Sequence, residues 1–196
     1  MSRRLIRRLD ADEEGVTAVE FAFVAPVMFM LIFGLLELGY VAFARSTLES
    51  AILDASRNSK VAECPAKNAA LIEQELTDRL AVISTHNNTP PKLTVRSYGS
   101  NFSNVGNPEP FNDIDASGSW DPGEPYTDFN GNGQWDEDMG KDGNYGQFGE
   151  VVEFTATIDV VSIVPFVAKA LNKNEGFYAI SAETVIRNEP FKDATC

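Results

Sequence analysis

The chain has 196 residues, which is enough for one domain with a modest core or for a membrane anchor followed by a smaller domain. Its formal net charge is −13, and ten acidic side chains against a single lysine lie between Glu109 and Asp142. Such a balance repels phosphate backbones, so we expect no nucleic-acid partner. Carboxylates concentrated among glycines and asparagines suit a metal cation better.

The N-terminus combines a charged leader with a long apolar segment. The leader, residues 1–15, contains four basic side chains: Arg3, Arg4, Arg7 and Arg8. The positive-inside rule places such a leader in the cytoplasm. No charged residue occurs from Phe21 to Leu36, and apolar residues on both sides extend this run. At 1.5 Å per residue, the predicted helix is long enough to cross a bilayer core about 30 Å thick.

Two simpler interpretations fit this segment less well. A signal peptide that is removed whole has a short apolar core followed by a small-residue cleavage site, whereas here the apolar run continues into an amphipathic helix. A plain anchor does not explain Glu20, because a carboxylate costs about 2.5–3.5 kcal/mol at the centre of a span and less near its end. We therefore expect Glu20 to have a partner.

Two N-terminal strings carry a family resemblance. Gly15–Pro26 reads Gly-Val-Thr-Ala-Val-Glu-Phe-Ala-Phe-Val-Ala-Pro, and Leu35–Gly39 reads Leu-Leu-Glu-Leu-Gly. Together they resemble the start of TadE-like proteins, a family of the type IV pilin superfamily. Arg187–Phe191 also resembles the end of TadE-like domains. The acidic segment is not part of the family's common pattern.

This resemblance implies how the chain is processed. In the superfamily a prepilin peptidase cuts on the cytoplasmic side after the leader glycine, which corresponds to Gly15. Val16 would become the new N-terminus, and Glu20 would be the fifth residue of the mature chain. In type IV pilins that glutamate neutralises the free amino terminus of a neighbouring subunit during assembly. Opposite charges about 4 Å apart in a poorly hydrated setting do stabilise each other.

The resemblance also implies a structural function and not an enzymatic one. The chain would be a minor pilin or pseudopilin of a Tad-type (type IVc) pilus, supporting assembly, surface attachment and biofilm formation. Its expected partners are the bacterial inner membrane, other pilins and the Tad assembly machinery. The C-terminal domain would lie in the periplasm, or outside the cell within the pilus. Two alternatives stay open: a type II secretion pseudopilin, and a membrane-anchored periplasmic calcium-dependent hydrolase.

Periodicity predicts further elements after the anchor. Apolar residues at three- and four-residue steps continue the first helix through 45–60 and predict a second helix over 68–83. A short helix is predicted at 165–171. Alternating patterns predict three strands: 92–98, 150–161 and 178–188. One long helix on a small antiparallel sheet is an α+β fold of the general pilin kind. Three parts are expected: a leader at 1–15, the long helix at 16–62 and an exported domain at 63–196.

An acidic insert, residues 109–146, contains a repeat with a period of fifteen residues. Both copies match a calcium loop in which oxygen ligands occupy positions 1, 3, 5, 7, 9 and 12, with glycine at position 6. The first copy supplies Asp113, Asp115, Ser117, Ser119, Asp121 and Glu124. The second supplies Asp128, Asn130, Asn132, Gln134 and Asp136. We therefore predict Ca²⁺ as a cofactor.

The second loop is incomplete, because Met139 stands at position 12. Glu137, Asp138 or Asp142 would have to replace the missing carboxylate. The plainer interpretation is a solvated, turn-rich loop. Against it, the ligand spacing occurs twice in register, and tryptophan occupies position 8 both times, where an apolar side chain lets two such loops pair. A catalytic pair of carboxylates fits poorly, because no nucleophile or histidine is apparent nearby.

The remaining reactive side chains are two cysteines and one histidine. In an exported chain, Cys64 and Cys196 would more often form one disulfide than remain free thiols. His86 lies in the polar run 85–89, where we expect it to be solvated and without a role.

Overall fold

The computed structural model describes residues 14–61, 69–171 and 176–189. Its elements are helices α2 (Glu14–Val61), α3 (Ala69–Leu80) and α4 (Pro165–Ala170), short 3-10 turns η2 (His86–Asn88) and η3 (Phe102–Asn104), and strands β1 (Lys92–Ser97), β2 (Lys141–Asp142), β3 (Val151–Val161) and β4 (Phe177–Arg187). The fold is α+β, as the sequence predicts.

The long helix α2 is continuous over 48 residues and confirms the predicted helix. Its two halves differ in their surroundings. Before Ala42 most apolar side chains are exposed, whereas Ala44, Leu48 and Ile52 are almost fully buried. Pro26 lies inside the helix, in the apolar stretch where proline is best tolerated in membrane-spanning helices. The first half of α2 therefore exposes most of its apolar side chains, and the second half belongs to a core.

The sheet has four antiparallel strands in the order β2-β1-β3-β4. Alternate residues of β3 are buried, from Val152 through Phe154 to Val160, as the period of two requires when one face is covered. β4 pairs with β3 over its whole length, from Val151 opposite Arg187 to Val161 opposite Phe177. The strands predicted at 92–98, 150–161 and 178–188 are thus present, and β2 is an additional short strand at the edge.

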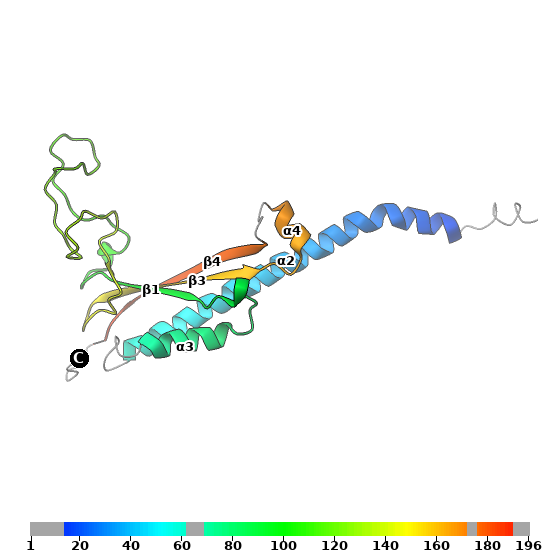
Figure 1. The fold of residues 1–196 in the computed structure, drawn as a ribbon, viewed down its shortest axis with the longest axis horizontal. Coiled ribbons are helices and arrows are strands. Elements are labelled where there is room, and N and C mark those ends of the chain that lie inside the picture. The colour runs from blue at the N-terminus through cyan, green and yellow to red at the C-terminus, as the bar shows by residue number, and fades with distance from the viewer. Residues whose placement is uncertain (1–13, 62–68, 172–175, 190–196) are drawn as a thin grey trace, which may run out of the picture. The chain divides into compact units, whose positions relative to one another are not determined.

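The core of the sheet domain lies between β1–β3 and two helices. α3 runs beside the C-terminal part of α2, and both helices cover one face of the sheet (Figure 1). Ile72, Leu76 and Leu80 of α3 are buried at four-residue steps. An ion pair of 2.6 Å between Arg79 and Asp54 joins the two helices at the surface.

The described residues gather into two compact units. One consists of α2 up to Ala42 together with the connection Ser162–Gly176, which contains α4. The other contains the rest of α2, α3 and the sheet. The short helix predicted at 165–171 is confirmed by α4. The boundaries predicted at residues 15 and 62 stay predictions.

Two details differ from the sequence predictions. α3 ends at Leu80 and not at residue 83, because turn-type hydrogen bonds replace the helix there, with the Ile83 N–H donating to the Leu80 carbonyl at 2.9 Å. Ile83 nevertheless stays buried. His86 is half-buried and not fully solvated, since its ring stacks on Phe177 with 4.6 Å between centroids. His86 therefore packs against Phe177, a contact that its polar sequence neighbours do not indicate.

Candidate functional site

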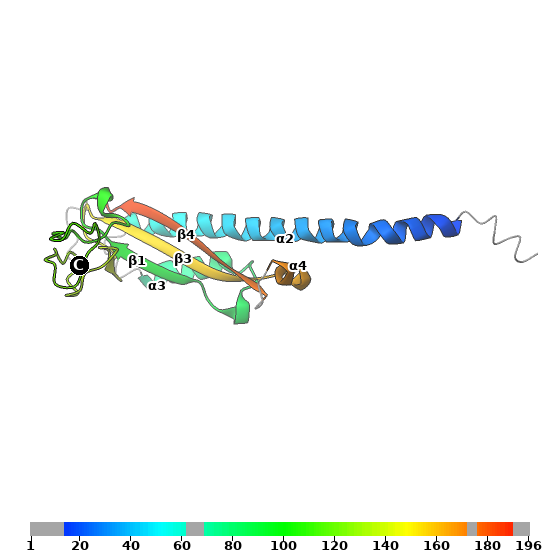
Figure 2. The ribbon, with the colours of Figure 1, turned by 90° about the horizontal axis from the view of Figure 1, so that it is seen from above.

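The acidic insert lies in the long connection between β1 and β3, beyond one end of the sheet (Figures 1 and 2). The chain enters and leaves this region side by side, because the Met139 N–H donates to the Asn107 carbonyl at 3.0 Å. Glu109 and Asp136 are likewise joined by a backbone hydrogen bond of 3.0 Å. Both fifteen-residue repeats therefore lie in one closed loop region.

The first repeat folds into a tight turn that is held by its own carboxylates. The carboxylate of Asp113, at position 1, accepts the backbone N–H groups of Ser117 (3.1 Å) and Gly118 (2.9 Å). Asp115 also accepts the Ser117 N–H, at 3.0 Å, and this bond is the main cause of its lowered pKa. Gly118 has a φ of +80°, a left-handed conformation that favours glycine at the sharp turn.

Three carboxylates of this repeat converge. One oxygen each from Asp113, Asp115 and Glu124 lie within 4.8 Å of one another. Ca²⁺–oxygen distances are 2.3–2.6 Å, so ligands around a single ion lie at most about 5 Å apart. The donor set consists of hard carboxylate oxygens, which is the chemistry that Ca²⁺ prefers. The residues of the first loop therefore fit a calcium ion.

The second repeat has the same backbone arrangement. The carboxylate of Asp128 accepts the N–H groups of Asn132 (3.2 Å) and Gly133 (2.9 Å), and the side-chain oxygen of Asn130 accepts the Asn132 N–H at 3.0 Å. Gly133 has the same φ of +80° as its counterpart in the first repeat. The amides of Asn130 and Asn132 both donate to Asp136, at 2.7 and 2.6 Å. The two loops are thus structural copies.

Each loop is closed by a glutamate: Glu124 at the end of the first loop, and Glu109, which precedes both loops. In the first loop, Glu124 accepts the N–H of position 2, Ile114, at 2.7 Å and that of position 9, Asp121, at 3.1 Å. In the second loop the same two bonds go to Glu109: from Phe129, position 2, at 2.7 Å and from Asp136, position 9, at 3.3 Å.

Glu109 and Glu124 also make matching contacts through their backbone carbonyls. The indole N–H of Trp120, at position 8 of the first loop, donates to the Glu124 carbonyl at 3.1 Å. Trp135, at position 8 of the second loop, donates to the Glu109 carbonyl at 2.9 Å. Glu109 is fully buried. Sequence reasoning missed this residue because it precedes both loops. The signal was available: Glu109-Pro110 and Glu124-Pro125 are fifteen residues apart, so the repeat begins four residues earlier than its calcium-loop spacing suggests.

The repeats pair about an approximate two-fold relation. Asn112 N–H donates to the Pro125 carbonyl (2.9 Å) and Thr127 N–H to the Pro110 carbonyl (2.8 Å), which forms an isolated antiparallel bridge. The rings of Trp120 and Trp135 stack at 5.1 Å, in agreement with the predicted pairing through position 8. Two edge-to-face contacts flank the stack: Phe111 with Trp135, and Tyr126 with Trp120.

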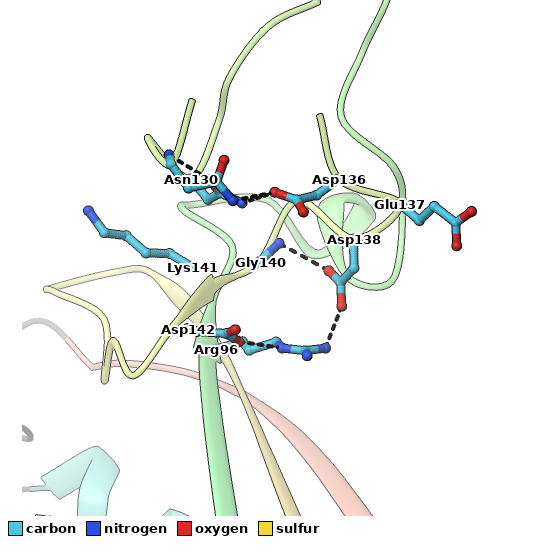
Figure 3. Close-up of a pocket in the computed structure, with 9 residues that line it drawn as sticks. Arg96, Asn130, Asp136, Glu137, Asp138, Gly140, Lys141 and Asp142 are labelled. Atoms are coloured by element: carbon cyan, nitrogen blue, oxygen red, sulfur yellow. Dashed lines mark hydrogen bonds and ion pairs between the residues drawn. The ribbon is translucent and has the colours of Figure 1, made fainter. Parts of the chain in front are cut away.

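The acidic residues at the end of the insert have a different role from the one the sequence suggests. Asp138 and Asp142 both point at the guanidinium of Arg96, with distances of 2.6 and 2.7 Å, whereas Glu137 points away (Figure 3). Met139 is buried. In the second loop, Glu109 makes the backbone contacts that Glu124 makes in the first, as described above.

A buried tyrosine lies beneath this ion-pair cluster. The Tyr98 hydroxyl lies 2.9 Å from a Glu153 oxygen and 3.1 Å from an Asp138 oxygen. Burial and these two carboxylates raise the pKa of Tyr98 well above its ordinary value. A Cβ at Gly140 would lie only 2.7 Å from the Tyr98 ring, so only glycine fits there. The cluster fixes the end of the insert to β1 and β3.

The second candidate region is the apolar half of α2. Of the described residues, Thr17–Arg57 forms one helix that is long and apolar enough to span a membrane. Phe23, Met30 and Leu35 are each more than 60% exposed, which is costly in water but suited to lipid or to other apolar helices. Residues 15–57 match the family model described as TadE-like protein. This segment is TadE-like. No curated protein and no solved structure gives a significant match to the chain.

The TadE-like helix contains two carboxylates in its apolar half. Gly15 and Val16 lie in its first turn, and Glu20 is exposed on its surface one turn further on. Glu37 is fully buried, and its Oε2 accepts the backbone N–H of Val164 at 2.9 Å. The sequence resemblance includes Glu37 but assigns it no partner. A lone charge between two apolar runs was the signal that it must have one.

The TadE-like family is structural and not enzymatic, and it belongs to a membrane-associated pilus system. The predicted disulfide partners, Cys64 and Cys196, lie outside the described residues. Their pairing stays a prediction.

Proposed function

We propose that this chain is a structural minor pilin or pseudopilin of a Tad-type pilus. The observation that carries the proposal is the coincidence of the TadE-like match over residues 15–57 with a long helix whose first half exposes its apolar side chains. In this proposal a prepilin peptidase cleaves after Gly15 while the helix is in the bacterial inner membrane. The basic leader stays in the cytoplasm, and the sheet domain reaches the periplasm.

Assembly would transfer the helix from lipid to a bundle of pilin helices. Both surroundings are apolar, so the exposed side chains of α2 are compatible with each of them. The cleaved amino terminus of Val16 is a new positive charge at the start of this helix. Glu20, exposed on the same helix, is the group that would neutralise the amino terminus of a neighbouring subunit. Partners are therefore sister pilins and the Tad assembly machinery, and the expected outcome is attachment of cells to surfaces and biofilm formation.

The test is the mature N-terminus of the protein isolated from its native membrane. N-terminal sequencing that begins at Val16 supports the proposal, and an intact Met1 end would contradict it and favour a simple anchor. Co-purification with Tad pilins then distinguishes a Tad pilus from a type II secretion system, whose pseudopilins share the leader.

We propose further that the acidic insert binds two Ca²⁺ ions. The first site would use Asp113, Asp115, Ser117, the Ser119 carbonyl, Asp121 and Glu124. The second would use Asp128, Asn130, Asn132, the Gln134 carbonyl, Asp136 and Glu109. Support comes from the converging oxygens of the first loop and from the matching contacts of Glu109 and Glu124. A bound cation would offset the repulsion between these carboxylates and so stabilise the insert.

Calcium outside the cell is often millimolar, so a high affinity is not required. Dissociation constants of about 10⁻⁴–10⁻³ M are usual for extracellular modules. Trp120 and Trp135 are the only tryptophans and lie within the loops, so their emission reports on this region alone. Titration of the calcium-depleted, detergent-solubilised protein should give a saturable change in emission and a higher melting temperature, with Mg²⁺ as the control. If millimolar calcium changes neither quantity, the insert is a solvated loop.

A further inference from the structure

The connection between β3 and β4 is unusually apolar for a surface segment. We define the α4 segment as Ser162–Leu171; it contains α4 and has Lys169 as its one charged side chain. Three of its large apolar side chains are about half exposed: Ile163 (51%), Phe166 (52%) and Leu171 (53%). Such a group in water would be unfavourable and marks an interaction surface.

The α4 segment is attached to the apolar half of α2 at two places. The backbone N–H of Val164 donates to Glu37 Oε2 at 2.9 Å, and the ring of Phe166 packs edge-on against Phe33 with 5.9 Å between centroids. Phe33 itself stacks on Phe29 one turn earlier. The α4 segment and this part of α2 belong to the same compact unit.

These contacts fix the depth of the α4 segment relative to the apolar run. Phe33 lies within the charge-free stretch Phe21–Leu36, three residues from its end. At 1.5 Å per residue this is about 4.5 Å inside the end of the stretch. If α2 spans the bilayer, Phe166 lies at the boundary between the hydrocarbon and the headgroups. Interfacial helices bury their apolar side chains about 5–10 Å into this boundary.

Glu37 explains why a chain segment is needed there. Its carboxylate is fully buried, and its second oxygen, Oε1, has no hydrogen-bond partner among the described residues. Without the α4 segment, this charge would face lipid directly, at a cost of kilocalories per mole. The segment supplies a backbone N–H to the carboxylate, and its own exposed side chains include the apolar Ile163 and Phe166.

We propose that the α4 segment is a second membrane contact, which lies in the outer interface of the bilayer against α2 and is positioned by Glu37. Its partner is the lipid surface. The exposed Lys169 suits anionic headgroups, as basic residues do on interfacial helices. The inference rests on the proposed membrane insertion of α2, but it concerns a segment that the TadE-like match does not include.

The experiment uses the full-length protein reconstituted in vesicles of phosphatidylethanolamine and phosphatidylglycerol. A photoreactive benzophenone side chain replaces one phenylalanine at a time: Phe166 as the test, Phe33 as the positive control and Phe102 as the negative control. Phe102 matches Phe166 in exposure, at 52%, but lies in the long polar connection after β1. After illumination, mass spectrometry counts adducts with lipid and with protein.

Lipid adducts at position 166 that approach those at 33 and exceed those at 102 severalfold support the proposal. Adducts at 33 but not at 166 overturn it and leave the membrane anchor intact. Adducts at neither position overturn the anchor and, with it, this inference. Protein–protein adducts at 166 in place of lipid adducts show that another copy covers the segment and also overturn it.

The role of Glu37 has its own readout. Glu37→Ala should reduce lipid adducts at position 166 severalfold while those at 33 remain. Glu37→Gln should restore them, because its amide oxygen can still accept the Val164 N–H. Equal labelling at position 166 in the Glu37→Ala protein, the Glu37→Gln protein and the protein with Glu37 would show that Glu37 does not position the α4 segment.

Discussion

The carboxylate of Glu109 accepts backbone N–H groups from the loop that begins at Asp128, and that of Glu124 accepts them from the loop that begins at Asp113. The first loop is thus closed by its own last residue, whereas the second loop is closed by a residue that precedes both loops and is incomplete without Glu109. Because the tryptophans of the two loops also stack on each other, a change in one loop reaches the other. The two proposed calcium sites are therefore expected to be coupled.

The first prediction concerns these glutamates. Glu109→Gln should weaken the second calcium site by about tenfold or more, about 1.4 kcal/mol, because it removes one negative charge from the ligand set. Glu124→Gln should do the same to the first site. Isothermal titration calorimetry of the solubilised protein separates the two. Glu137→Gln is the matched control, since its side chain is exposed and points away from the pocket around Arg96 (Figure 3). If Glu109→Gln binds calcium as the parent does, Glu109 is not a ligand.

The second prediction concerns processing. Gly15→Ala should be cleaved at a normal or reduced rate, whereas the branched side chain of Gly15→Val should cause precursor to accumulate. Glu20→Ala should be cleaved but should fail to assemble, because the amino terminus of its neighbour lacks a counter-charge. Immunoblots of membrane and sheared-pilus fractions measure both effects. Normal pili in the Glu20→Ala strain would contradict the pairing role.

The third prediction is a disulfide between Cys64 and Cys196 in the exported protein. Closing a loop of about 130 residues would stabilise the fold by roughly 4–5 kcal/mol through chain entropy, as an upper estimate. Mass spectrometry of non-reduced peptides from periplasmic protein should find the cross-linked pair. Two alkylatable thiols in that material would refute it.

The fourth prediction concerns alkaline pH and Tyr98. Because its pKa is raised in the folded protein, Tyr98 stays protonated when the unfolded chain, with a pKa near 10, begins to ionise. The unfolded state then binds fewer protons, so the free energy of unfolding falls as pH rises above about 10 and is unaffected below it.

Tyr98→Phe should remove this part of the pH dependence. At neutral pH it should cost about 1.5–3 kcal/mol, since the hydroxyl bonds charged acceptors. Thermal melts between pH 7 and about 11 measure both effects. Tyr126→Phe is the control for the cost at neutral pH, because it changes a tyrosine outside this cluster; burial also raises the pKa of Tyr126, so this variant does not control for the alkaline slope. An unchanged slope in Tyr98→Phe would show that Tyr98 ionises normally.

Local patterns in the sequence were sufficient to predict every described element longer than three residues. A period of 3.6 found α2 and α3, and a period of two found β1, β3 and β4, because burial of one face imposes these repeats. β2 escaped notice because two residues, Lys141 and Asp142, carry no periodicity; Arg96 on the neighbouring strand holds them there. Partners distant in sequence, such as Glu37 with Val164, depend on tertiary packing that no local window contains.

The same distinction between local patterns and contacts distant in sequence applies to the candidate site. Spacing alone located both loops of the repeat, because all but one of the proposed ligand positions lie within twelve consecutive residues. The contacts of Glu109 with the second loop were missed, since a search that proceeds forward from Asp128 meets Glu137 and Asp138 and never returns to Glu109. Because the two repeats are related by an approximate two-fold, the glutamate that closes the second loop, Glu109, precedes the first loop in the sequence.

The hydrogen bond between Asn107 and Met139 brings together the two ends of the loop region that contains the repeats. Because the two ends of the loop region are hydrogen-bonded to each other, they connect to the sheet as the ends of a short turn would, whatever the length of chain between them. A segment with adjoining ends can be exchanged as a cassette without altering the register of β1 and β3. The side chains of the insert can then change while β1 and β3 keep their pairing.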